Sequence, residues 1–416
     1  MKANKATIAV SGLSVASTLA PGLPVMLSIK AEPEFHGSIV GLSHDPLDPP
    51  NYAPDVVDRV FLVPYPVQGA EHLFHRIEYA HSKQPIDAII PTLDSELPLY
   101  LEIAARLEEL GIGTVLPDAA TLGRRSKMNL SAIAPRIGLR APYSRVAYNY
   151  NDVLTLAREF LLPFVVKGHY YGAIPVHSLD QLPAAAATVA GAWGYPVVLQ
   201  EYVPGIEYDT AALGAGDGRL LGAVPMKKLQ LDGRGKAWGG MTVEDPQLVR
   251  AAYLLAAELE WPGPMEIEVM RHIHTNEPYL IEVNPRFPAW VQLTAAAGQN
   301  LPWALARLAC GEKVEPFEGY QVGVMSLRRN FDVACPSGIY ESLVMDGEVD
   351  LRSVSKNRMQ PYWVSTRDSG ADLHVRNGAA GPALAAPEDS EQARRPAPAQ
   401  SIEPKMEIPE TEVAPE

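Results

Sequence analysis

Short apolar runs alternate with longer amphipathic segments over the first 117 residues of the chain. The apolar runs are rich in β-branched and aliphatic residues, which predicts buried strands; they lie at residues 6–10, 38–42, 57–63 and 87–91. In segments 70–81 and 97–110 apolar residues recur every three to four positions, which is typical of amphipathic helices. Strands that alternate with helices form a parallel sheet with right-handed crossovers. We therefore predict an open α/β domain, with Asp94 and Glu96 beside a crevice at the carboxyl edge of its sheet.

The pattern changes after residue 117. A helical stretch that carries Lys127 is followed by a turn at 138–142. A strand, an alanine-rich helix and another strand are then predicted at 162–167, 181–192 and 197–201, which makes a second and smaller α/β unit. The following part is richer in strands. Its strands are predicted at 211–213, 220–224, 265–270 and 279–283, and its helices at 247–259 and 303–310.

These changes divide the chain into three folded parts and a tail, with mixed α/β and α+β character. We predict a parallel-sheet domain at 1–117, a small lobe at 118–203, a larger antiparallel-sheet lobe at 204–366 and a tail at 367–416. Residues 381–416 contain seven prolines, no aromatic residue, and three basic against eight acidic residues. Because such a segment buries too little apolar surface to offset the entropy of ordering, we expect the tail to be disordered.

Composition excludes some classes of function. The 416 residues are 47% hydrophobic and 20% charged, which is ordinary for a globular protein with enough apolar material for a core. The formal net charge is −14, which argues against a nucleic-acid partner held by a broad basic field. An acidic substrate would therefore need a local cluster of basic residues.

Two features bear on the cellular location. The two cysteines, Cys310 and Cys335, are too few for a disulfide scaffold or a thiolate metal site and fit a reducing compartment. The apolar run 6–20 could also be read as a secretory signal. We favour a first strand instead, because Gly12 and Gly22 interrupt the run too early for a membrane span of about 20 residues. We expect a cytoplasmic protein with no membrane partner.

Two lysines are candidates for binding an anion. Lys167 ends the apolar strand at 162–167, where an ammonium group is costly to desolvate unless it meets a negative charge. Gly168 and Gly172 follow, and the backbone N–H groups of such a small-residue loop could bind phosphates. Taken alone, however, Lys127 and Lys167 are more often solvated surface charges.

The segment 197–207 combines an extended run with a Pro-Gly turn and a later acid. Its backbone could offer donors and acceptors to an adenine edge, and Glu207 could accept hydrogen bonds from ribose hydroxyls. The alternative is a strand and turn with exposed acids, which we would favour if this segment stood alone.

The strongest candidate site lies in the segments 265–270 and 279–286. Strand alternation places Glu266 and Glu268 on one face of the first strand, and Glu282 and Asn284 on one face of the second. If the strands pair antiparallel across a turn at 274–278, two carboxylates and an amide oxygen converge. Hard oxygen ligands of this kind suit Mg²⁺ that also bridges phosphates. Buried acids without a cation would be costly, so a purely structural role is disfavoured.

Three further cations could meet an anionic ligand. Arg286 carries a planar guanidinium that suits a carboxylate or phosphate. Lys227 and Lys228 precede the glycine-rich loop 231–240, which could close over an anionic intermediate as a flap. A plain flexible hairpin is an equally good interpretation of that loop.

Taken in order, these segments resemble the ATP-grasp superfamily, in particular the branch of biotin carboxylase and the large subunit of carbamoyl-phosphate synthase. The resemblance runs to about residue 315, and its most specific part is Glu268 with the Glu-Val-Asn-Pro-Arg motif at 282–286. It implies a three-lobed ATP-grasp architecture. By the same resemblance Glu268, Glu282 and Asn284 are metal ligands, and Arg286, Lys228 and Lys227 are catalytic. The nucleotide-binding residues that it implies are Lys127, Lys167, Gly172, Glu201, Tyr202, Val203 and Glu207.

The activity that the resemblance implies is ATP-dependent ligation of a carboxylate to an amine. Such an enzyme forms an acyl phosphate, releases ADP and phosphate, and makes an amide or peptide bond. The expected cofactors are ATP and Mg²⁺, with Mn²⁺ as a substitute. The expected substrates are a small carboxylate and a small amine, with amino acids or a peptide among the options. A homodimer is the expected assembly. Two alternatives stay open: a bicarbonate-activating carboxylase component, and a nucleotide-binding regulatory protein without turnover.

Overall fold

A computed structural model describes residues 2–14, 20–168, 172–232, 235–328, 332 and 334–353. The chain divides into two units, Met1–Tyr362 and Trp363–Glu416, and everything below concerns the first. The tail predicted at 367–416 lies outside the described residues. Among the described residues no helix has both the length and the apolar character needed to cross a membrane.

The N-terminal part is a five-stranded sheet in the order β15-β3-β2-β1-β4. Four of these strands are mutually parallel, namely β1 (Thr7–Ser11), β2 (Ser38–Ser43), β3 (Arg59–Leu62) and β4 (Ala88–Ile90). This confirms the predicted open parallel sheet. The sequence did not reveal β15 (Glu348–Asp350), which comes from far along the chain and pairs antiparallel with β3. It thereby covers an edge that would otherwise expose unpaired backbone groups.

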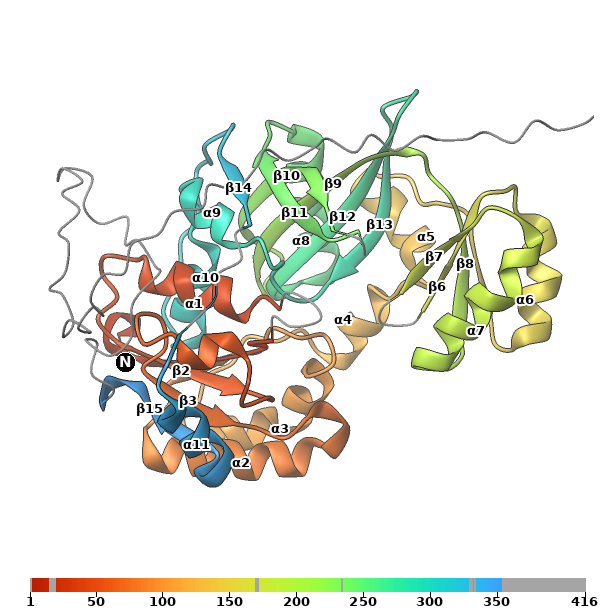
Figure 1. The fold of residues 1–416 in the computed structure, drawn as a ribbon. Coiled ribbons are helices and arrows are strands. Elements are labelled where there is room, and N and C mark those ends of the chain that lie inside the picture. Colours follow the sequence, from red (N-terminus) through yellow and green to blue (C-terminus); the bar gives the residue numbers. More distant parts are fainter. Residues whose placement is uncertain are drawn as a thin grey trace, which may run out of the picture. The chain divides into compact units, whose positions relative to one another are not determined.

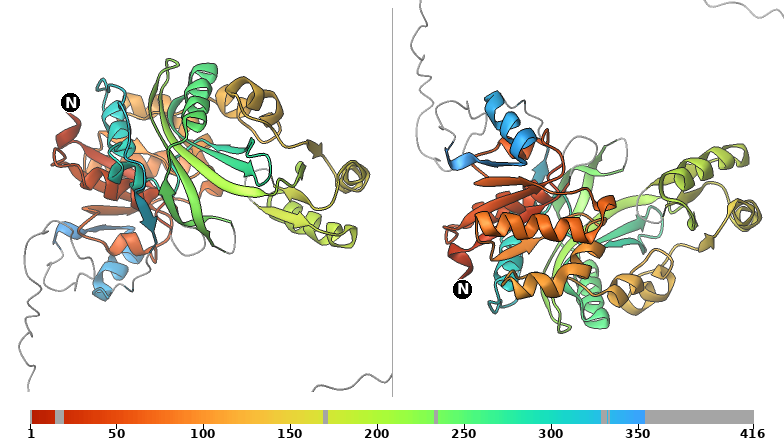
Figure 2. Two further views of the ribbon diagram at one scale, coloured as in Figure 1. Left: turned by 90° about the horizontal axis from the view of Figure 1, so that it is seen from above. Right: turned by 90° about the horizontal axis from the view of Figure 1, so that it is seen from below.

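Helices cover both faces of this sheet (Figures 1 and 2). On one face α2 (Ala70–Lys83) and α3 (Leu97–Glu109) pack through residues such as Ile77 and Ile103. On the other face lie α1 (Gly22–Lys30) and α10 (Leu301–Ala309). Because α10 also contacts the large antiparallel sheet, the two sheets share one apolar core.

The small lobe is an antiparallel sheet in the order β5-β8-β6-β7. Its strands are β5 (Ser144–Ala147), β6 (Phe164–Lys167), β7 (Ala173–Val176) and β8 (Val197–Glu201). The helices α6 (Tyr150–Leu156) and α7 (Leu182–Trp193) belong to this lobe. The sequence pattern does not predict β5 and β7, because both are short and β7 contains a proline.

The large lobe is a six-stranded antiparallel sheet in the order β13-β12-β9-β10-β11-β14. Its strands are β9 (Gly205–Ala215), β10 (Leu220–Leu231), β11 (Ala237–Thr242), β12 (Pro262–His272), β13 (Pro278–Asn284) and β14 (Met325–Leu327). The helix α8 (Pro246–Leu259) packs on one face through an apolar cluster with Leu255 and Trp261. The other face continues into the core shared with the N-terminal sheet.

Besides several short 3₁₀ helices, four α-helices remain among the described residues. They are α4 (Ala119–Arg124), α5 (Leu130–Ile133), α9 (Gln292–Ala296) and α11 (Ser337–Asp346). Two local predictions need correction. Lys127 lies in the turn between α4 and α5 rather than on a helix, and the loop predicted at 231–240 is largely the β10–β11 hairpin, with Gly233 and Arg234 outside the described residues.

Candidate active site

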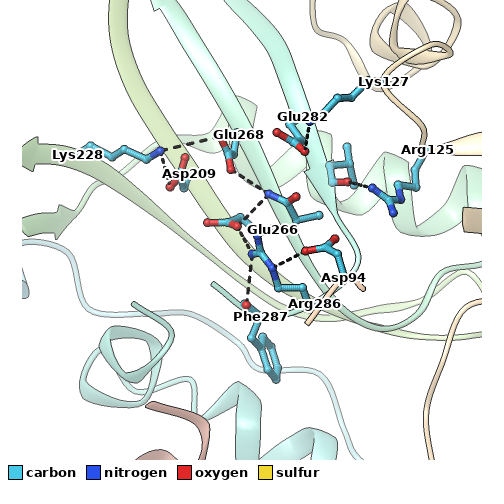
Figure 3. Close-up of polar contacts among 12 residues, drawn as sticks. Asp94, Arg125, Lys127, Asp209, Lys228, Glu266, Glu268, Glu282, Arg286 and Phe287 are labelled. Atoms are coloured by element: carbon cyan, nitrogen blue, oxygen red, sulfur yellow. Dashed lines mark hydrogen bonds and ion pairs between the residues drawn. The ribbon is translucent and has the colours of Figure 1, made fainter. Parts of the chain in front are cut away.

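The β12–β13 hairpin brings the predicted acidic residues together. Its antiparallel register pairs Glu266 with Asn284 and Glu268 with Glu282. All four side chains therefore lie on the face of the sheet opposite α8, as strand alternation predicted. The neighbouring residues Ile267 and Val283 point the other way, into the cluster around α8. Figure 3 shows the resulting group of polar side chains.

A bulge in β13 makes this arrangement possible. The register shifts between Glu268 and Val269, so that Val269 pairs with Leu280 and Ile281 is left as the extra residue. Without the shift, Leu280 and Glu282 would share a face. With it, Leu280 is buried in the apolar cluster while Glu282 lies in the polar group.

Asn284 ties the two acids of β12 together. Its Nδ2 donates to Glu268 Oε1 at 2.9 Å and to Glu266 Oε2 at 3.1 Å. From the sequence, the amide oxygen of Asn284 was expected to join the metal ligands. In the structure the amide nitrogen holds the acids, so the amide oxygen lies on the far side of that group from Glu266 and Glu268.

Arg286 connects this hairpin to the N-terminal sheet. Its Nε donates to Asp94 Oδ2 at 3.1 Å, and its Nη1 donates to Glu266 Oε2 and, at 3.4 Å, to the carbonyl oxygen of Phe287 (Figure 3). Asp94 follows β4, at the carboxyl edge where the sequence predicted a crevice. The guanidinium is therefore held between two carboxylates from different sheets, which fixes its orientation.

Lys228 lies at the other end of the polar group. Its Nζ is 2.9 Å from Glu207 Oε2, 3.1 Å from Asp209 Oδ2 and 4.0 Å from Glu268 Oε2. Burial alone would lower the pKa of Lys228. The surrounding carboxylates outweigh burial and hold that pKa well above its usual value, so the ammonium form is firmly retained.

Lys127 and Lys167 approach Glu282 from the small-lobe side. Lys127 Nζ is 3.2 Å from Glu282 Oε1 and donates to the carbonyl oxygen of Gly168 at 3.4 Å. Lys167 is buried at the end of β6, and burial lowers its pKa although Glu282 opposes that effect. The backbone N–H of Gly168 donates to Gly172 O, which closes the β6–β7 loop whose residues 169–171 are not described. The two lysines thus supply positive charge to one carboxylate.

The facing acids Glu268 and Glu282 differ in acidity. Burial would raise the pKa of Glu268, but Lys228 and Arg286 outweigh it and the pKa lies below the usual value. For Glu282 burial outweighs the effect of Lys127, and the pKa is raised. Neighbouring cations thus oppose the cost of burying both carboxylates.

The residues fit a magnesium ion that phosphates help to hold. Glu268 and Glu282 provide two facing carboxylates, which are hard oxygen donors. Within the described parts of the chain, no set of three or more His, Cys, Asp or Glu side chains is placed to hold a metal by itself. Magnesium commonly binds through one or two carboxylates plus substrate phosphates, so this donor set suits a nucleotide-dependent site.

The other predicted residues lie at different distances from this group. Glu201 ends β8 and accepts a hydrogen bond from the Tyr143 N–H at 3.0 Å, Tyr202 is exposed, and Val203 is buried. Strand alternation in β10 places Lys227 on the α8 side of the sheet, away from Lys228. The structure therefore brings together the acids, Arg286 and three of the four predicted lysines, but not Lys227.

Asp209 is a further residue of this group that the sequence pattern did not predict. It lies on β9 between Met226 of β10 and Glu268 of β12 in register, on the face that carries the acids. A signal was available, because Glu207 and Asp209 are two residues apart in a strand and must share a face. The strand predicted at 211–213 was too short to include them.

Comparison with known proteins adds independent support for the fold. A family model described as "ATP-grasp in the biosynthetic pathway with Ter operon" matches residues 195–327. The large chain of carbamoyl phosphate synthase from Xanthomonas campestris pv. campestris is 24% identical over 281 residues, which are 62% of this chain. The chain spans only about a quarter of the length of that relative.

Two solved structures share the architecture. The L-amino acid ligase from Bacillus licheniformis has a TM-score of 0.56 at 17% identity, covering 74% of this chain and 75% of its own. The biotin carboxylase domain of 2-oxoglutarate carboxylase from Hydrogenobacter thermophilus has a TM-score of 0.59 at 15% identity, covering 76% and 72%. That domain was solved with MgADP, ADP and bicarbonate. At these identities the likeness shows a common fold.

Proposed function

We propose that this chain is an ATP-dependent carboxylate–amine ligase of the ATP-grasp superfamily. The observation that carries the proposal is the acid pair Glu268–Glu282 with cations on both sides. Lys127 and Lys167 flank Glu282, while Lys228 lies near Glu268. Such a group suits a polyphosphate held with a metal, because phosphoryl transfer is catalysed largely by positioning and charge neutralisation.

Each part of the site has a role in this proposal. Glu268 and Glu282 would hold Mg²⁺ or Mn²⁺, which when bound adds positive charge at the phosphates, and Asn284 would position Glu268 through its amide nitrogen rather than bind the metal. Lys127 and Lys167 would bind the phosphates together with the Gly172 loop. The segment from Glu201 to Val203 would meet the adenine, and Glu207 would accept hydrogen bonds from the ribose. Lys227 has no role in this assignment, since it lies on the other face of β10.

The proposed reaction has two steps. First, a substrate carboxylate oxygen attacks the γ-phosphorus, the bond to the bridging oxygen breaks, and ADP leaves with that electron pair. Second, a neutral amine attacks the acyl carbon, a C–N bond forms, and phosphate leaves with the electrons of the C–O bond while the amine proton is lost to solvent. Arg286 and Lys228 would stabilise the charge of the transferring group and of the acyl phosphate.

The second candidate is activation of bicarbonate for a carboxylase. The structural likeness to a biotin carboxylase domain favours it, since that domain was solved with bicarbonate. In that case bicarbonate would take the place of the carboxylate, and a carrier-bound acceptor would take the place of the amine. A regulatory protein without turnover is disfavoured, because a pure binder would not need the full set of Glu268, Asn284 and Arg286.

A phosphate-release screen tests the proposal. The purified full-length chain is incubated with Mg·ATP and with pairs drawn from amino acids, other small carboxylates and amines, and separately with bicarbonate and biotin. The ligase should release ADP and phosphate only with a carboxylate, and hydroxylamine should trap the activated acid as a hydroxamate. Turnover with bicarbonate and biotin alone would favour the carboxylase. AMP as the stoichiometric product would overturn the acyl phosphate.

A further inference from the structure

Asp209 is a buried carboxylate with one unsatisfied oxygen. It is 2% exposed, and its Oδ2 lies 3.1 Å from Lys228 Nζ. Its Oδ1 has no hydrogen-bond partner among the described residues. A buried acceptor without a donor costs about 1–3 kcal/mol, and more when it is charged. An arrangement that costs stability in this way needs a compensating reason.

The charges around Asp209 make the arrangement more costly. Lys228 is within 4.0 Å of three carboxylates, those of Glu207, Asp209 and Glu268, so one ammonium faces three acids. Glu268 lies directly across from Asp209 in the β9–β12 register. Burial, opposed by Lys228 but joined by the negative charges of Glu268 and Glu266, raises the pKa of Asp209 well above its usual value, so its charged form is costly here. Stability alone would therefore favour a neutral residue at position 209.

The three acids hold Lys228 in different ways. Glu207 is the closest, but its side chain is 29% exposed and can turn toward a ligand. Glu268 is more distant, at 4.0 Å, and faces Glu282 at the metal-binding pair. Asp209 is close to Lys228 and enclosed, with its strand paired on both sides. It is therefore the partner that cannot leave when a nucleotide engages Glu207 and a metal engages Glu268.

We propose that Asp209 is a positioning residue that anchors the Lys228 ammonium during catalysis. This inference rests on the proposed function, in which Lys228 stabilises the acyl phosphate. When nucleotide and metal recruit the other two acids, the Asp209 carboxylate keeps Lys228 at a fixed point beside Glu268. Preorganised charge of this kind lowers the barrier without costing reorganisation during the reaction.

The test compares Asp209→Asn with Thr210→Val. Thr210 is the next residue, is equally buried, and also has an unsatisfied side-chain oxygen, but alternation places it on the opposite face. Thr210→Val removes an unsatisfied buried oxygen, and Asp209→Asn removes the charge of a buried carboxylate. Neither variant should therefore lower the melting temperature. Asp209→Asn should lower kcat about tenfold with KM for ATP nearly unchanged, whereas Thr210→Val should leave both constants unchanged. Equal kcat in the two variants would overturn the proposal.

A double-mutant cycle separates anchoring from a general packing effect. If Asp209 acts through Lys228, then Asp209→Asn should add almost no further loss of kcat in a Lys228→Met background. Additive losses would show that Asp209 acts independently of Lys228 and would overturn the proposal. Should Lys228→Met fail to fold, Lys228→Gln serves in the same cycle.

A crystal structure of Asp209→Ala distinguishes failure of this inference from failure of the proposed function. The Lys228 Nζ should move away from its place between Glu207 and Glu268, because its enclosed partner is gone. If the unaltered protein turns over no carboxylate, the proposed function fails, and this displacement still decides whether Asp209 is the anchor. An unmoved Nζ in Asp209→Ala would overturn the inference whatever the activity.

Discussion

The two faces of the six-stranded sheet have opposite properties although they are built from the same strands. On the α8 side lies an enclosed apolar cluster that includes Ala212, Met265, Ile267, Val269, Leu280 and Val283. On the other side the same strands carry Asp209, Lys228, Glu266, Glu268, Glu282 and Asn284. Strand alternation and one bulge separate the two sets. The α8 face is therefore mainly apolar, whereas the other face combines the polar group with part of the apolar core shared with the N-terminal sheet.

The difference lies in how each face contributes to the free energy of unfolding. Burying an aliphatic side chain such as Ile267 stabilises the fold by about 1.5–3 kcal/mol. Burying a carboxylate such as Glu268 is costly unless cations and hydrogen bonds compensate, and pairs of this kind add little net stability. Substitutions on the α8 face should therefore change stability, and substitutions on the polar face should change activity.

The largest effect is expected for Glu282→Gln on the polar face. The change keeps the size of the side chain but removes the negative charge that would bind the metal and that Lys127 contacts. Turnover should fall on the order of 10³-fold, because a hard anionic ligand is lost. Steady-state phosphate release at increasing magnesium measures the loss. Near-normal turnover at saturating magnesium would remove Glu282 from the site, and an unchanged melting temperature serves as the control for folding.

The matching change on the α8 face is Ile267→Ala. Ile267 is 1% exposed and lies between Glu266 and Glu268 in β12. Its truncation should lower the free energy of unfolding by about 2–5 kcal/mol, as cavity-forming substitutions do. Urea unfolding measures this loss, and KM for ATP should stay the same at a temperature where the variant is folded. A loss of turnover as large as that of Glu282→Gln would show that the two faces are not separable.

The β12–β13 hairpin was the part of the candidate site that the sequence predicted best. Period-two alternation places Glu266 with Glu268, and Glu282 with Asn284, and the antiparallel pairing follows from the short turn between the segments. The structure confirms the antiparallel pairing, and it adds a bulge that alternation alone did not predict. Local pattern was sufficient because each pair of side chains lies within one strand and the two strands are adjacent in sequence.

Contacts between distant segments could not be predicted in this way. Asp94 and Arg286 are 192 residues apart, and only the docking of two sheets brings them together. The same holds for β15, which reaches β3 from the far end of the described chain. Lys227 and Lys228 were both predicted to be catalytic, because the strand predicted at 220–224 ended before them. In the structure β10 continues to Leu231, so both lysines lie in a strand and alternation places them on opposite faces.

A smaller effect is expected for Asp94→Asn, which alters the polar face from the neighbouring sheet. Asparagine can still accept the hydrogen bond from Arg286 Nε, but it no longer offers a charge to the guanidinium. We expect kcat to fall about tenfold, equivalent to roughly 1.4 kcal/mol of barrier, with little change in stability.

The matched control for Asp94→Asn is Asp45→Asn. Asp45 follows β2 at the same edge of the parallel sheet, and its carboxylate accepts hydrogen bonds from the Leu47 N–H and the Tyr65 hydroxyl rather than from Arg286. Phosphate release should be unchanged in this variant. If Asp94→Asn behaves like Asp45→Asn, the guanidinium does not depend on the N-terminal sheet for its orientation.

The smallest expected effect is a pH dependence of the free energy of unfolding, which comes from residues of the N-terminal domain. His44 Nε2 lies 2.6 Å from Glu96 Oε1, and Ser11 Oγ donates to Glu96 Oε2 at 2.5 Å. Burial lowers the pKa of His44, but the Glu96 carboxylate outweighs it and raises that pKa above 6.5. A raised pKa means that the pair stabilises the fold fully below about pH 6.5, and that this contribution disappears as pH rises through the folded-state value. The difference in unfolding free energy between the unaltered protein and His44→Gln should therefore be larger at about pH 5.5 than at about pH 8.5, as urea unfolding at both pH values would measure. A difference that grows with pH instead would show that His44 is neutral in the folded protein.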